Sequence, residues 1–273
     1  MKNTRFILTD TILWGFNFPQ SRKKNQFSSR LTLCVLRGLN LAPKVIQTLA
    51  TQVFPNLESL ADIYLSLHET GIKDSEFAAL FSGLKNGVLK NNKYFGVAIF
   101  EPALTGKAFE VLAADILPQL QNVEIFGCYL FGNPNFQDES FIKFNKSWQK
   151  VASNIAKIIF KFEHTGITDK GIKEFALKTL PAMKNLKTAD ISFGNTARLG
   201  DEGIVNLFHG FGGHVERLSS LDLSLSYTGV TDVGIEAIKR RQDLEAWKKF
   251  SLDISGTKVS QGNQSFVKQH FKK

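Results

Sequence analysis

The residues with the clearest potential for chemistry are aspartates that recur at a fixed spacing. The most regular of them, separated by 31, 32 and 31 residues, are Asp138, Asp169, Asp201 and Asp232. Carboxylates that converge can hold a divalent metal ion or share general acid–base work. Since these aspartates occur once per repeat, we expect a ladder rather than a converging cluster. Each stands where a helix is predicted to begin, so we interpret them as helix-capping residues.

Other candidate ligands and nucleophiles lack the spacing that their chemistry needs. His209 and His214 flank three glycines at a spacing of five, whereas a zinc pair on a helix needs i, i+4 spacing and a third ligand. We interpret this stretch as a glycine C-cap and turn after a helix that ends at His209. Cys34 and Cys128 lack Cys or His neighbours at ligand spacing, so we expect buried, inert thiols. The sequence therefore predicts a non-enzymatic protein with no catalytic residue, metal or cofactor.

These aspartates belong to a longer repeated phrase. Residues 165–172 (TGITDKGI) recur as residues 228–235 (TGVTDVGI), with looser copies at 70–74 and 199–204. An alternating apolar and polar stretch precedes the phrase, as in residues 221–225 (LDLSL), and predicts a strand with one buried face. Apolar residues at three- and four-residue steps follow it and predict a helix. Each copy is therefore a strand–turn–helix unit.

Stacking such units predicts an α/β solenoid with parallel strands on a concave face and helices on a convex face. We expect seven or eight units of about 31 residues. The predicted strands lie near residues 31–36, 63–67, 95–100, 123–129, 158–162, 189–193, 221–225 and 250–254. A further helical stripe, interpreted as core rather than as a nucleic-acid stacking platform, consists of Phe141, Phe144, Trp148, Val151 and Ile155.

In these features the chain resembles the leucine-rich repeat superfamily, in its ribonuclease-inhibitor-like branch. The resemblance implies a concave sheet face that binds protein partners, with a solvated face and an interface on a flank or end as the alternative. The residues predicted to line the concave face are Tyr64, Ser66, Glu124, Phe126, Ile159, Lys161, Asp190, Ser192, Asp222 and Ser224.

Composition and charge narrow the classes of protein and partner. The chain has 273 residues, 43% of them hydrophobic, a net charge of +9 and only two cysteines. These values disfavour wholesale disorder and a disulfide-stapled scaffold, and no apolar run reaches the length of a membrane span. The net charge is +5 for residues 1–30, −2 for 31–238 and +6 for 239–273. A nearly neutral body disfavours nucleic acid as the partner.

The two basic ends suggest further roles. Residues 1–30 are interpreted as an N-terminal cap or basic extension, with a mitochondrial transit peptide as the alternative. Residues 31–260 form the predicted repeat domain, and residues 261–273 a basic C-terminal cap. We expect electrostatic docking of an acidic partner at the tips of the solenoid, with the candidate docking residues Lys239, Arg240, Arg241, Lys248 and Lys249.

Together these features predict a non-catalytic protein-interaction scaffold or adaptor subunit of a larger assembly. Its partners would be one or more proteins. The expected compartment is the cytoplasm, with a mitochondrial or a ciliary or cytoskeletal setting as alternatives. Other interpretations are a ubiquitin-ligase substrate adaptor or an accessory regulator of an enzyme, such as a GTPase activator that uses Arg37.

Overall fold

The computed structural model describes residues 30–31, 36–37, 42–56, 62–85, 88–148, 151–212, 217–241 and 247–271. The segment 1–29, Cys34 and His214 lie outside these described residues, as does the side chain of Arg37. Their predicted roles as cap, transit peptide, buried thiol, turn residue and GTPase-activating arginine therefore stay predictions.

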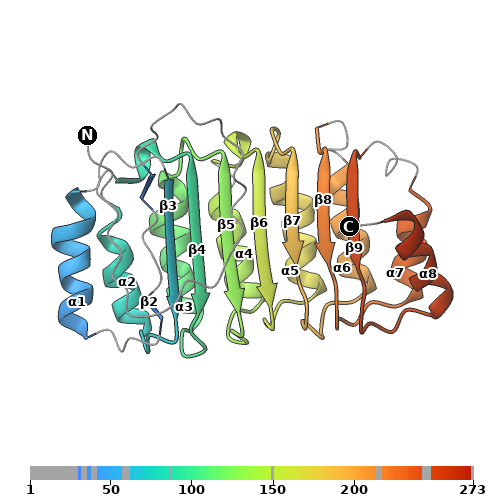
Figure 1. Ribbon diagram of the computed structural model, residues 1–273, viewed down its shortest axis with the longest axis horizontal. Coiled ribbons are helices and arrows are strands. Elements are labelled where there is room, and N and C mark those ends of the chain that lie inside the picture. Colours follow the sequence, from blue (N-terminus) through green and yellow to red (C-terminus); the bar gives the residue numbers. More distant parts are fainter. Residues whose placement is uncertain are drawn as a thin grey trace.

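Strands and helices alternate along the chain (Figure 1). The strands are β1 (Arg30–Leu31), β2 (Leu36–Arg37), β3 (Asp62–His68), β4 (Tyr94–Phe100), β5 (Ile125–Phe131), β6 (Lys157–Glu163), β7 (Thr188–Ser192), β8 (Ser220–Ser224) and β9 (Lys249–Asp253). The helices are α1 (Pro43–Thr48), α2 (Asp74–Ser82), α3 (Gly106–Val111), α4 (Asp138–Trp148), α5 (Asp169–Glu174), α6 (Asp201–Gly212), α7 (Asp232–Lys239) and α8 (Gln261–His270). Within the described ranges, none of the helices has the length and apolar character to cross a membrane.

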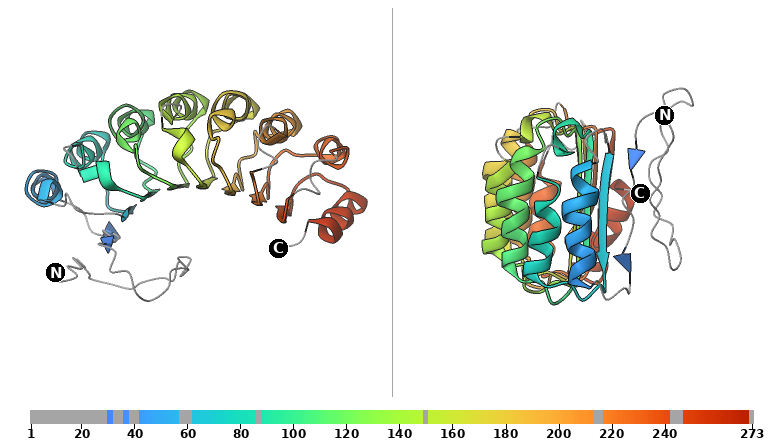
Figure 2. Two further views of the ribbon diagram at one scale, coloured as in Figure 1. Left: turned by 90° about the horizontal axis from the view of Figure 1, so that it is seen from above. Right: turned by 90° about the vertical axis from the view of Figure 1, so that its left-hand side faces the viewer.

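The described strands form one parallel sheet whose spatial order follows the chain from β3 to β9. β1 and β2 both pair with β3 at one end of the sheet. Seen from above, the sheet curves along the inside of an arc and helices cover its outer side (Figure 2). The predicted α/β architecture, with a curved parallel sheet and an outer layer of helices, is therefore confirmed.

The core lies between the sheet and the helices. One buried column crosses the sheet in register and consists of Leu65, Val97, Cys128, Phe160, Ile191, Leu223 and Leu252. Burying such side chains stabilises the fold by about 1.5–3 kcal/mol each. The predicted stripe from Phe141 to Ile155 is also buried, which confirms it as core.

Two kinds of unit alternate on the helical side. After α1, α3 and α5 the chain widens into a five-residue π-helical turn, then tightens into a 3-10 turn that contains a proline. These prolines are Pro55, Pro118 and Pro181. Proline cannot donate to the carbonyl four residues earlier, so the regular helix ends before it. No proline lies within α2, α4 and α6, and the described residues of these three helices contain no π-helical turn.

The recurring aspartates join each unit to the next. The Asp201 carboxylate accepts hydrogen bonds from the Thr231 backbone N–H at 2.8 Å, the Thr231 hydroxyl at 2.6 Å and the Gly234 N–H at 3.0 Å. Asp138 makes the same three bonds to Thr168 and Gly171. Thr168 and Thr231 in turn cap their own helices. The prediction of helix capping is confirmed, but each aspartate binds the helix start of the following unit.

Glycine at the third helical position makes this contact between units possible. A Cβ on Gly234 would lie 2.6 Å from Asp201 Oδ1, and one on Gly171 would lie 2.5 Å from Asp138 Oδ1. Gly203 has the same relation to Asp169, at 2.5 Å. The Thr-Asp-x-Gly pattern therefore recurs because the glycine of one unit leaves room for the aspartate of the unit before it.

The glycines after His209 have a different role from the predicted cap. Helix α6 continues to Gly212, so Gly210 lies inside the helix rather than in a turn. A Cβ at Gly210 would lie 2.3 Å from the Ala176 carbonyl oxygen, which belongs to the neighbouring unit. The prediction of a turn at Gly210 is wrong, because this glycine permits close approach of two adjacent helical segments.

We predict that the Asp201–Gly234 contact is energetically coupled. Asp201→Ala should lower the free energy of unfolding by about 1–3 kcal/mol because three donors lose their acceptor. Gly234→Ala should also destabilise, since its Cβ displaces the carboxylate. In the Asp201→Ala background, the same alanine should be neutral or stabilising, because alanine is favoured over glycine in a helix by about 1 kcal/mol.

Urea unfolding of the four proteins of this double-mutant cycle measures the coupling. Simple additivity of the two single losses would contradict the account.

Candidate functional site on the concave face

Alternate side chains of the strands form rows across the concave face of the sheet. One row in register is Tyr64, Gly96, Gly127, Ile159, Asp190, Asp222 and Ser251. The next row is Ser66, Ala98, Tyr129, Lys161, Ser192, Ser224 and Asp253. Eight of the ten residues predicted for this face lie in these two rows, so the sequence pattern placed them together correctly.

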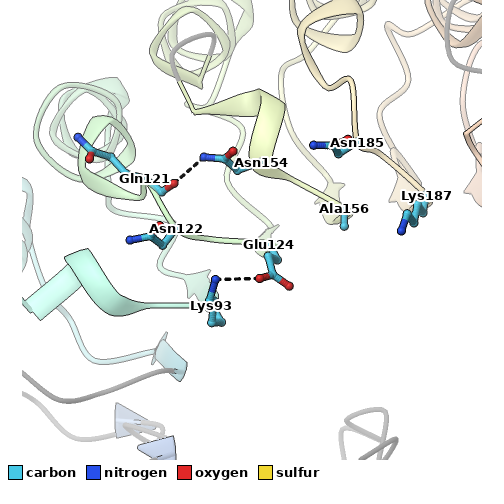
Figure 3. A pocket seen from close by; sticks show the side chains of 8 residues that line it. All are labelled: Lys93, Gln121, Asn122, Glu124, Asn154, Ala156, Asn185 and Lys187. Atoms are coloured by element: carbon cyan, nitrogen blue, oxygen red, sulfur yellow. Dashed lines mark hydrogen bonds and ion pairs between the residues drawn. The ribbon is translucent and has the colours of Figure 1, made fainter.

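The two other predicted residues, Glu124 and Phe126, were assigned to the concave face wrongly. Phe126 is fully buried, with its ring centroid 4.1 Å from that of Trp148. Glu124 precedes β5, at the edge of the sheet where the strands begin, and its carboxylate lies 2.9 Å from Lys93 Nζ (Figure 3). The predicted register of this strand was off by one residue, so its outward residues are Ile125, Gly127 and Tyr129.

Three tyrosines gather on the face at β3, β4 and β5, and we call Tyr64, Tyr94 and Tyr129 the tyrosine cluster. The Tyr64 and Tyr129 rings meet edge to face with centroids 6.2 Å apart. A Cβ on Gly96 would lie 2.6 Å from Tyr64 Cδ2 and 2.7 Å from the Tyr94 hydroxyl oxygen. The rings therefore occupy space that the missing side chain leaves free.

Gly127 supports the cluster in the same way. A Cβ at this position would lie 3.0 Å from Tyr129 Cε2 and 3.5 Å from the Tyr94 hydroxyl oxygen. Tyr94 and Tyr129 remain partly exposed, whereas Tyr64 is buried. We call Gly96 and Gly127 the glycine floor. It lets two accessible aromatic rings pack directly against the sheet. Sequence reasoning missed Tyr94 and Tyr129, although aligning Phe95-Gly96 with Phe126-Gly127 at the 31-residue period would have given the correct register.

The environment keeps the hydroxyl groups of Tyr94 and Tyr129 neutral. Burial, followed by the neighbouring phenols Tyr129 and Tyr64, raises the pKa of Tyr94 well above its ordinary range. Burial, followed by Tyr64, raises the pKa of Tyr129 in the same direction, and the two hydroxyls are hydrogen-bonded to each other. These groups can therefore donate and accept hydrogen bonds without carrying charge.

The other half of the face, over β6 to β9, is polar. Lys161 and Asp190 form an ion pair between neighbouring strands. The Ser192 hydroxyl donates to Glu163 at 2.7 Å, and the Ser224 hydroxyl donates to Asp253 at 3.2 Å. Each contact joins one strand to an adjacent one, so these side chains are held in fixed positions beside the tyrosine cluster.

The predicted docking residues at the C-terminal end divide into two groups. The Lys239 ammonium contacts Glu236 and Asn263 and lies 4.5 Å from the centre of the Phe266 ring, which fastens α7 to α8. Lys239 therefore has a structural role, and its docking of an acidic partner stays a prediction. Arg240, Lys248 and Lys249 are exposed, and Arg241 lies against Gly212 at the end of α6.

The described residues contain no group of three or more His, Cys, Asp or Glu side chains arranged to hold a metal ion. Cys128 is fully buried, and burial raises the pKa of its thiol far above the ordinary value, so this sulfur is not a reactive thiolate.

Comparison with known proteins yields matches among solved structures alone. No family model matches the chain, and no curated protein matches it. Among solved structures, a chain in the crystal structure of the Rad7 and Elc1 complex in yeast is similar, with 17% sequence identity and a TM-score of 0.32. The match covers 85% of this chain and 77% of that chain. At this level of similarity it assigns no function.

We predict that the tyrosine cluster makes the fold sensitive to alkaline pH. A phenol whose pKa is raised in the folded protein keeps its proton after the unfolded chain has lost it. Stability therefore falls as pH rises above about 10, the ordinary tyrosine value. Urea midpoints measured across alkaline pH should decline less steeply for the Tyr94→Phe/Tyr129→Phe variant than for the original protein. Equal declines in the two proteins would show that other groups, such as lysines, cause the whole effect.

Proposed function

We propose that the chain is a leucine-rich repeat protein of the ribonuclease-inhibitor-like kind and acts as a non-catalytic protein-interaction scaffold or adaptor subunit. The repeated strand–turn–helix unit and the curved parallel sheet support the repeat assignment. The proposed binding face is the concave surface around the tyrosine cluster. The observation that carries the proposal is that Gly96 and Gly127 hold Tyr94 and Tyr129 in place while leaving them partly exposed.

Tyrosine is well suited to protein recognition for physical reasons. Its ring supplies a large contact area with few rotatable bonds, and its hydroxyl forms hydrogen bonds. Such residues often dominate the free energy of binding, because ordering them costs little conformational entropy. Here the glycine floor has already restricted the rings, so little further ordering is needed when a partner binds.

The polar half of the face would contribute specificity. Lys161 and Asp190 present opposite charges on neighbouring strands, and Asp222 lies beside Asp190 in the same row. Charges at the border of an apolar contact steer a partner and penalise wrong partners more than they strengthen binding. The face thus places an aromatic half beside a polar half, and protein interfaces commonly mix such apolar and polar contacts.

The non-catalytic part of the proposal is supported by how the described carboxylates are used. Asp138 and Asp201 bind helix starts, and Asp190 pairs with Lys161. A general acid or base has to be free to exchange a proton with a substrate, whereas these groups are engaged in structural contacts.

Site-specific photo-crosslinking tests which face meets a protein partner. A photoreactive phenylalanine analogue replaces Tyr129 in one protein and Val205 in a matched control, since Val205 is exposed on α6 of the helical layer. In an extract of the native cell, we expect position 129 to give a discrete crosslinked protein and position 205 to give none. Crosslinking from position 205 alone would contradict the concave face as the binding surface.

A further inference from the structure

The nearly neutral charge of the repeat body conceals a separation of charge in space. In each unit, the segments that lead from a helix into a strand lie at the edge where the strands begin, which we call the amino edge. The segments that lead from a strand into a helix lie at the opposite edge. The two kinds of segment alternate along the chain, so a net charge summed over a stretch of sequence combines the charges of both edges.

The amino edge is basic over most of its length. In the described position 62 and ranges 83–85, 88–94, 119–125, 151–157, 182–188, 217–220, 239–241 and 247–249, the acidic residues are Asp62, which begins β3, and Glu124, which Lys93 neutralises. Eight basic residues of these ranges are exposed or partly exposed and form no ion pair among the described residues. They are Lys90, Lys157, Lys184, Lys187, Arg217, Arg240, Lys248 and Lys249.

The opposite edge holds the recurring aspartates of the repeat. Its segments contain Asp74, Asp138, Asp169, Asp201 and Asp232, which bind the helix start of the next unit. Those carboxylates therefore stabilise the fold and complement the positive ends of the helix dipoles. Several lysines of the amino edge have no such structural use. Lys157 and Lys249 are the first residues of strands, and Lys187 directly precedes one, so none lies in the last turn of a helix.

A polar groove of about 360 Å³ runs along the middle of the amino edge (Figure 3). The amide nitrogens of Asn122, Asn154 and Asn185 each donate to a backbone carbonyl of the preceding unit, namely those of Lys90, Gln121 and Ser153. An amide NH2 group has two N–H donors, so each asparagine retains one further donor. Lys187 lines the same groove, as does the Lys93–Glu124 ion pair. Ammonium groups beside a ladder of amide donors form a surface that complements carboxylates.

We propose that the amino edge is a docking surface for an acidic, extended protein segment, which the groove lined by Asn122, Asn154 and Asn185 receives and the flanking lysines hold. This is a second surface, and it stands whether or not the tyrosine cluster is an interface. It also revises the expectation of docking at the tips alone, because the basic strip continues from Lys248 and Lys249 through the middle of the body.

The arrangement of aromatic side chains favours a protein segment over single-stranded nucleic acid. Nucleic acid without sequence preference binds where exposed rings stack on bases beside a basic groove. The large exposed aromatic side chains of the described residues are Phe131 and Tyr227, which lie on the opposite edge. In the amino-edge ranges, Tyr94 is the one partly exposed aromatic residue, and it belongs to the tyrosine cluster and does not line the groove. The groove itself is lined by lysine, asparagine, glutamine, alanine and glutamate side chains.

Fluorescence anisotropy with the full chain tests the proposal. The probe is a labelled peptide of alternating glutamate and serine, and an oligouridylate with the same number of negative charges is measured beside it. The edge variant is Lys157→Gln/Lys184→Gln/Lys187→Gln. The matched control, Lys107→Gln/Lys170→Gln/Lys258→Gln, removes the same charge from exposed lysines of the opposite edge.

We expect the peptide to bind in low salt, and the edge variant to weaken binding about tenfold while the control changes it less than about twofold. Circular dichroism should show both variants folded, since neither removes an ion pair described here. Equal weakening by both variants would overturn the proposal, because binding would then depend on net charge alone. Tighter binding of the oligouridylate than of the peptide would also overturn it. Absence of peptide binding at low ionic strength would overturn it outright.

Discussion

Most repeat units of this fold depend on a carboxylate supplied by the unit before them. A helix start has backbone N–H groups without partners inside the helix, and they need an acceptor. In this chain the acceptor for Thr231 and Gly234 is Asp201, and the acceptor for Thr168 and Gly171 is Asp138. Because the bond crosses between units, it fixes the offset of neighbouring helices as well as capping one of them. The shared offset keeps the strands in register and so determines which side chains share the concave face.

Glycines leave space for a neighbouring side chain in two places, on opposite sides of the sheet. At Gly171, Gly203 and Gly234 the absence of a Cβ admits the aspartate of the preceding unit. At Gly96 and Gly127 it admits the rings of the tyrosine cluster. In the first case the free space serves stability, and in the second it orders an accessible aromatic surface. Both uses depend on strand register, since a shift of one residue would bring a side chain into the space.

The sequence was informative where local chemistry fixes local structure. The phrase with Thr168 and Asp169 predicted a helix start because hydroxyl and carboxylate groups cap helices, and the structure confirms a helix there. The predicted register of strand β5 is wrong because apolar residues occupy both of its faces. Glu124, which precedes the strand, fits the alternation as an outward residue. The partners of the aspartates and the tyrosine cluster depend on contacts about 31 residues apart, which a period suggests but single positions do not reveal. The charge separation was hidden because segments of the two edges alternate along the chain.

The proposed function requires that the tyrosine cluster on the concave face contacts a protein partner. Hydroxyl-radical footprinting of the purified complex with that partner measures this directly, because oxidation of a tyrosine ring depends on its exposure. We predict that Tyr94 and Tyr129 become protected in the complex. Tyr227, which lies on the opposite edge and is 60% exposed in the free chain, should stay reactive. Protection of Tyr227 with unchanged oxidation of Tyr94 and Tyr129 would contradict this prediction.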